Sequence, residues 1–138
     1  MFHRIMAPVD LAHIAQLDRA LQCTADLAKQ YGVPVTYVSV TSSAPTSIAH
    51  NPQEFDAKLT AFAKGEADKH GIEATSHMIL AHDPSIDIDG ALRHAIDETE
   101  ADLVVMASHV PGRLEYIWHS HGGRLAEHAK CSVFIVRP

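Results

Sequence analysis

Residues 5–10 read Ile-Met-Ala-Pro-Val-Asp, a nearly unbroken apolar run that ends at a carboxylate. Residues 102–106 have the same character in the run Asp-Leu-Val-Val-Met. Short, continuous apolar runs are typical of parallel strands that helices bury on both faces. We therefore expect both runs to be central strands, with bounds His3–Val9 and Asp102–Met106.

Outward from these runs, segments with helical spacing of apolar residues alternate with short strand-like segments. Gly32 is expected to cap the first helix in a left-handed conformation, and Gly71 to stop the second. Asn51 and Pro52 provide a cap and a first-turn residue for that second helix. The expected strands are Pro34–Val40, Glu73–Leu80 and Ser132–Arg137, and the expected helices are Ile14–Gln30, Pro52–Lys69, Ile86–Thr99 and Ser120–Ala129.

This alternation predicts a single α/β domain over residues 1–138, with right-handed crossovers and helices on both faces of the sheet. The expected sheet is doubly wound, mostly parallel and five-stranded, in the order 3-2-1-4-5. The strand Glu73–Leu80 contains several polar residues, so we place it at an edge. Ligands of such folds bind where the strand order reverses, here between the first and fourth strands.

Composition excludes several classes of partner. The net charge is -6 and no basic run occurs, so nucleic acid and acidic membrane surfaces are not expected partners. We expect no membrane span and no signal peptide. Cys23 and Cys131 have neither metal-type nor CxxC spacing, which favours reduced thiols and a cytoplasmic location. The eleven histidines are scattered, and we interpret them as surface residues.

The fold places residues 8–10 and 106–109 at the expected ligand crevice. Asp10, at a strand tip, suits either of two roles. Its carboxylate can take a ribose hydroxyl or a hydrated divalent ion, or it can cap the following turn. The pair His119 and His121 suggests a metal, but no third fixed ligand supports it, so no metal is expected. We find no nucleophile with a base, no nucleophile elbow and no paired carboxylates, and therefore name no catalytic residue.

Three of these segments together resemble the universal stress protein family. Residues 5–10 look like its first strand and acidic residue, and residues 102–109 resemble its fourth strand, which usually ends in Met-Gly-Ser-His-Gly. Residues 128–137 are similar to its closing segment, His-Ala-Pro-Cys-Pro-Val-Leu-Val-Val-Arg. The resemblance implies a Rossmann-like fold of the adenine nucleotide alpha hydrolase type. By resemblance, the nucleotide-binding positions are Pro8, Val9, Asp10, Val40, Met106, Ala107, His109 and Ser120.

The family's ATP-binding members carry Gly-x2-Gly-x9-Gly followed by Ser or Thr. The corresponding positions here are Ala107, Val110 and either His119 or Ser120, so all three glycines are absent. A Cβ crowds the backbone approach to phosphate oxygens, and Pro111 removes an N–H donor. The sequence therefore predicts weak or no ATP binding. Side chains of the 109–124 segment, such as His109 and Arg124, offer an alternative anion site.

The resemblance implies a non-enzymatic regulatory or binding protein of the stress response. ATP and AMP are its candidate ligands, and its protein partner is unidentified. The alternative is an adenine-nucleotide switch with slow or no hydrolysis, and a true catalyst ranks third. The resemblance also implies a homodimer paired through the last strand, because an apolar edge strand needs a cover. The pairing residues are Val133, Ile135 and Val136.

Overall fold

The computed structural model describes residues 1–108 and 121–137. All five strands pair in parallel, in the order β3-β2-β1-β4-β5, which confirms the predicted sheet. A 3-10 helix, η1, precedes the first α-helix. The strands are β1 (Ile5–Pro8), β2 (Val35–Thr41), β3 (Ala74–Leu80), β4 (Leu103–Ala107) and β5 (Ser132–Val136), and the helices are η1 (Leu11–Leu17), α1 (Asp18–Tyr31), α2 (Pro52–His70), α3 (Pro84–Thr99) and α5 (His121–His128).

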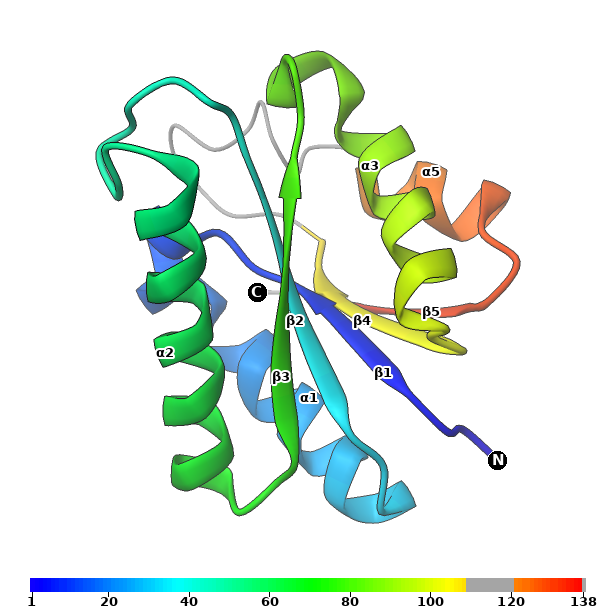
Figure 1. The fold of residues 1–138 in the computed structure, drawn as a ribbon. Helices are drawn as coiled ribbons and strands as arrows, with labels where there is room; N and C mark the ends of the chain where they lie inside the picture. Colours follow the sequence, from blue (N-terminus) through cyan, green and yellow to red (C-terminus); the bar gives the residue numbers. More distant parts are fainter. Residues whose placement is uncertain (109–120, 138) are drawn as a thin grey trace.

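The sheet lies between two helical layers, with α1 and α2 on one face and α3 and α5 on the other (Figure 1). This arrangement follows from right-handed crossovers, because the chain moves outward from β1 to β3 and then returns past β1 to β4. All of β1 is buried, as is β4 up to Met106, which confirms these apolar runs as central strands. Strand β3 lies at an edge, as predicted.

The first helical segment differs from its prediction. We expected one helix over Ile14–Gln30, whereas η1 begins at Leu11 and α1 at Asp18. The Asp10 side chain caps η1, and His13 has non-helical dihedral angles (φ -138°, ψ 36°). The cap starts the helix early and His13 interrupts it, so apolar spacing alone did not predict the kink.

Helix α2 begins at Pro52 as predicted and ends at His70, one residue beyond the predicted Lys69. The Asn51 side chain accepts a hydrogen bond from the Glu54 N–H at 2.8 Å, and Pro52 occupies the first turn. Gly71 ends the helix with φ 66°, a left-handed conformation that glycine adopts without strain. The carboxyl end of β2 and the amino end of α2 are thereby fixed on either side of residues 42–51, a segment that borders the site described next.

Candidate functional site

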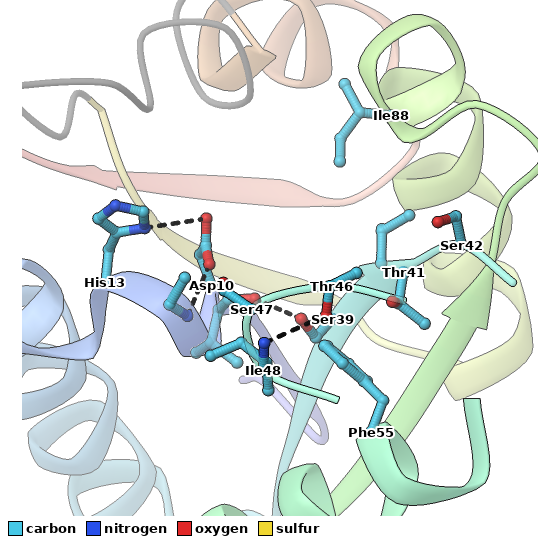
Figure 2. A pocket seen from close by; sticks show the side chains of 13 residues that line it. Asp10, His13, Ser39, Thr41, Ser42, Thr46, Ser47, Ile48, Phe55 and Ile88 are labelled. Carbon is cyan, nitrogen blue, oxygen red and sulfur yellow. Dashed lines mark hydrogen bonds and ion pairs between the residues drawn. The ribbon is translucent and has the colours of Figure 1, made fainter. Parts of the chain in front are cut away.

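A cavity of about 240 Å³ opens at the carboxyl ends of β1 and β2, beside the point where the strand order reverses (Figure 2). Both helical layers contribute to it, through Phe55 of α2 and Ile88 of α3. Its other described lining residues are Val9, Asp10, Ala12, His13, Ser39, Val40, Thr41, Ser42, Thr46, Ser47 and Ile48.

The two carboxylate oxygens of Asp10 make different contacts. One oxygen, Oδ1, accepts a hydrogen bond from the Ala12 N–H at 2.9 Å, which confirms the capping role. The other, Oδ2, lies 3.6 Å from His13 Nδ1 (Figure 2). Capping therefore occupies one oxygen and leaves the second on the cavity side, so the two roles considered for Asp10 do not exclude each other.

The end of β1 leaves backbone groups of β2 facing the site. The Val9 N–H donates to the Val38 carbonyl at 2.8 Å, and the Val9 carbonyl accepts from the buried Ser39 hydroxyl at 2.8 Å. Backbone groups alternate sides along a strand, so Val40 turns its N–H and C=O to the same side as Val38. Strand β1 has ended there, and no backbone hydrogen bond outside the ladders joins Val40 to another described residue. A donor and an acceptor are thus presented together beside the cavity.

Hydroxyl groups from the loop after β2 form a second wall of the cavity. Thr46 organises this loop, because its Oγ1 accepts from the N–H groups of Ile48 and Ala49, both at 3.2 Å. The Lys58 ammonium on α2 donates to the Ile48 carbonyl and ties the loop to that helix. The sequence predicted only a polar loop for this segment and no role in a site. The high content of Ser and Thr directly after a central strand was the feature that could have indicated a role.

The structure brings only part of the predicted site together. Val9, Asp10 and Val40 line the cavity. Pro8 is buried as the last residue of β1. Met106 and Ala107 end β4 and pair with β5, and they do not line the cavity as described. The predicted residues His109 and Ser120, as well as Val110, lie outside the described residues.

The described lining is uncharged apart from one pair of side chains. Asp10 and His13 are its only titratable groups, and it contains no Lys or Arg.

Within the described part of the chain, no cluster of His, Cys, Asp and Glu has a geometry that holds a metal ion. No helix in these same ranges is long and apolar enough to cross a membrane.

A parallel 3-2-1-4-5 sheet with a cavity at its carboxyl edge defines a doubly wound α/β protein, and the cavity lies where ligands of such folds usually bind. The sequence model of the universal stress protein family matches residues 1–137, so the chain belongs to that family. The resemblance found in the sequence is thereby confirmed.

Solved structures of this family share the fold along nearly the whole chain. A member from Burkholderia pseudomallei is 21% identical, with a TM-score of 0.66 over 96% of this chain and 94% of its own. The universal stress protein from Archaeoglobus fulgidus in complex with dAMP is 21% identical, with a TM-score of 0.63 over 96% of each chain. A member from Arabidopsis thaliana with AMP bound is 15% identical, with a TM-score of 0.65 over 98% of this chain and 90% of its own.

Proposed function

We propose that the protein is a non-enzymatic binding protein whose cavity holds the adenosine part of an adenine nucleotide. The proposal rests on one observation. The Val40 N–H and C=O, which strand β1 leaves unpaired, and the Asp10 carboxylate border the same cavity. The Watson–Crick edge of adenine places a ring-nitrogen acceptor beside an amino donor, which complements an N–H beside a C=O. The related proteins crystallised with dAMP and AMP support this ligand class.

Within this proposal, the base packs among apolar side chains and the sugar meets polar ones. Val9, Ile48 and Ile88 supply apolar surface for the adenine ring. Asp10 accepts hydrogen bonds from ribose hydroxyls, and the hydroxyls of the loop after β2 bind the remaining polar edge. These contacts do not require a charged phosphate.

The phosphate side favours short ligands over ATP. Ala107 stands where ATP-binding members carry their first glycine, and the described lining provides no Lys or Arg. We therefore infer that adenosine and AMP bind more tightly than ATP, whose four negative charges need hydrogen-bond donors around the phosphates.

We also infer a cytoplasmic homodimer. Two free cysteines suit a reducing compartment, and β5 is an edge strand that a second copy can cover.

Isothermal titration calorimetry with adenosine, AMP, ATP and GMP tests this function. We expect adenosine and AMP to bind, ATP to bind at least about tenfold more weakly, and GMP to give no heat. Ser42→Phe, which places a large ring at a lining position of the cavity, should abolish binding, whereas Ser43→Phe at the exposed neighbouring position should not. Micromolar ATP binding by the native protein would instead favour the nucleotide-switch alternative.

A further inference from the structure

Residues 46–50, here called the strap, form one wall of the cavity. Thr46, Ser47 and Ile48 line the cavity, and the strap belongs to the loop that arches from the end of β2 to the start of α2 (Figure 1). The Thr46 N–H donates to the Ala49 carbonyl at 2.8 Å, and the Thr46 hydroxyl accepts from two N–H groups of the same turn (Figure 2). These internal bonds close the turn but do not fix it to the rest of the protein.

Two charged side chains of α2 hold the strap from outside. The Lys58 ammonium donates to the Ile48 carbonyl, and Glu54 Oε2 accepts from the His50 N–H at 3.0 Å. Glu54 Oε1 also lies 3.5 Å from Lys58 Nζ. Among residues 1–108 and 121–137, no residue outside the strap other than Glu54 and Lys58 forms a hydrogen bond with it.

Apolar burial contributes little to the position of the strap. Ala49 is its one buried residue, at 4% exposure, and a methyl group is all that its side chain buries. Ile48 is half-buried, and the other three residues are exposed. Segments with few buried apolar contacts open locally at a low cost in free energy. The hydrogen bonds from α2 therefore decide whether Ile48 stays against the cavity.

Helix α2 presents Glu54 and Lys58 from a fixed base. The two side chains lie one turn apart on the same face of the helix, whereas Phe55 and Leu59 are buried. Hydrogen bonds from His50, first from its N–H and then from its ring, lower the pKa of Glu54, so the carboxylate stays charged beside Lys58. The Lys58 side chain is 51% exposed, so its ammonium can release the strap without unpacking the core.

We propose that Lys58 is a positioning residue of the cavity, which clips the Ile48 carbonyl and so keeps the strap closed over the ligand. This role rests on the proposed function of the cavity and adds how the bound ligand is retained. Lys58 is not among the described lining residues, so it acts through the strap. A ligand that binds only the clipped arrangement has an apparent Kd that rises as the population of that arrangement falls.

Isothermal titration calorimetry with adenosine tests this role. Lys58→Met keeps most of the side-chain length but removes the ammonium, and we expect the Kd to rise about fivefold. Lys58→Arg, which keeps N–H donors, should restore most of the affinity. Lys64→Met, at an exposed lysine of the same helix, is the matched control and should bind as the native protein does. Urea unfolding should give similar midpoints for both methionine variants, which separates a local clip from a loss of global stability.

A second measurement needs no ligand. The 15N heteronuclear NOE values of the Ile48 and Ala49 amides report fast motion of the strap, and they should fall in Lys58→Met but not in Lys64→Met. Unchanged NOE values in Lys58→Met would overturn the clip, whether or not adenosine binds. Lowered values with an unchanged Kd would overturn the positioning role and leave the adenosine site standing. If the native protein does not bind adenosine, the proposed function falls, and the NOE values alone decide the clip.

Discussion

At the residue scale, one carboxylate at each end of the sheet accepts hydrogen bonds from backbone N–H groups. Asp10 caps the turn after β1 at the carboxyl edge. At the opposite edge, Asp102 accepts backbone hydrogen bonds from His3 and Arg4, the shortest to each at 2.9 and 3.0 Å, just before β1 begins. The sequence predicted Asp10 just after one central strand and Asp102 as the first residue of the other, but their partners depend on which backbone N–H groups the fold leaves free.

The pKa of Asp102 gives a pH-dependent prediction. Burial tends to raise this pKa, but the N–H groups of Arg4 and His3 outweigh burial and lower it. A lowered folded-state pKa stabilises the protein above the ordinary carboxyl pKa of about 4, and the effect is lost as pH falls through the folded value. Because the Asp102 side chain is 38% exposed, solvent screens part of this effect, so Asp102→Asn should cost no more than about 1 kcal/mol at pH 7 in urea unfolding. The cost should shrink as the pH falls below about 4. Asp68→Asn, at an exposed position of α2, should show no such difference.

At the element scale, α2 shows where apolar spacing succeeds and where it fails. The helical spacing of apolar residues predicts a buried stripe, in which Phe55, Leu59 and Ala63 are buried while Phe62 and Ala67 are half-buried. Glu66 and His70 are also buried, each 8% exposed, which polar residue types did not indicate. The atoms His70 Nε2 and Glu66 Oε2 lie 3.2 Å apart across one turn of the helix, but their geometry is not that of a hydrogen bond, and neither atom has another hydrogen-bond partner among the described residues. Burial, reinforced by the charge of Glu66, raises the pKa of Tyr37 beneath them.

This buried pair predicts strong non-additivity. His70→Leu leaves the Glu66 carboxylate buried without its partner and should reduce the free energy of unfolding by about 3 kcal/mol. The double variant Glu66→Met with His70→Leu should recover most of that loss, because apolar residues replace both buried polar side chains. Urea unfolding of the single and double variants measures the coupling. Equal losses in both would mean that the pair is effectively solvated.

Gly65 inside α2 and Gly71 at its C-terminal cap give a matched pair of predictions. Gly71 has φ 66°, and an added Cβ meets no atom within 4 Å, so Gly71→Ala carries only the backbone cost of about 1 kcal/mol. Gly65 lies inside the same helix with equally open space, so Gly65→Ala should stabilise the protein by about 0.5–1 kcal/mol. Thermal unfolding should show opposite shifts in Tm. Shifts of the same sign would contradict the assigned end of α2.

At the scale of the whole molecule, the sheet has two edges with different expected roles. Strand β5 exposes Phe134 to 45%, and its Val133 packs against the core only in part. Val133→Lys with Ile135→Lys should therefore convert the proposed dimer to monomers, as measured by light scattering. Thr75→Lys with Leu80→Lys, at exposed positions of the edge strand β3, is the control and should leave the dimer intact. An unchanged dimer in the β5 variant would exclude this interface.

The fold was predictable from sequence because its main determinants are local. Continuous apolar runs marked β1 and β4, and Asn51 with Gly71 marked the bounds of α2. The site was predictable only in part. Val9 and Asp10 follow from strand order and Val40 from the family resemblance, whereas His13 and the loop organised by Thr46 depend on side-chain hydrogen bonds that periodicity does not encode.

The central claim is that adenosine binds against the Val40 backbone at the end of β2. The most direct measurement is a titration of 15N-labelled protein with adenosine, followed through amide chemical shifts. We predict a large, saturable shift of the Val40 amide, with smaller shifts at Ala12 and Ser42 around the cavity. A titration that leaves the Val40 amide unmoved, with or without shifts elsewhere, would contradict the account.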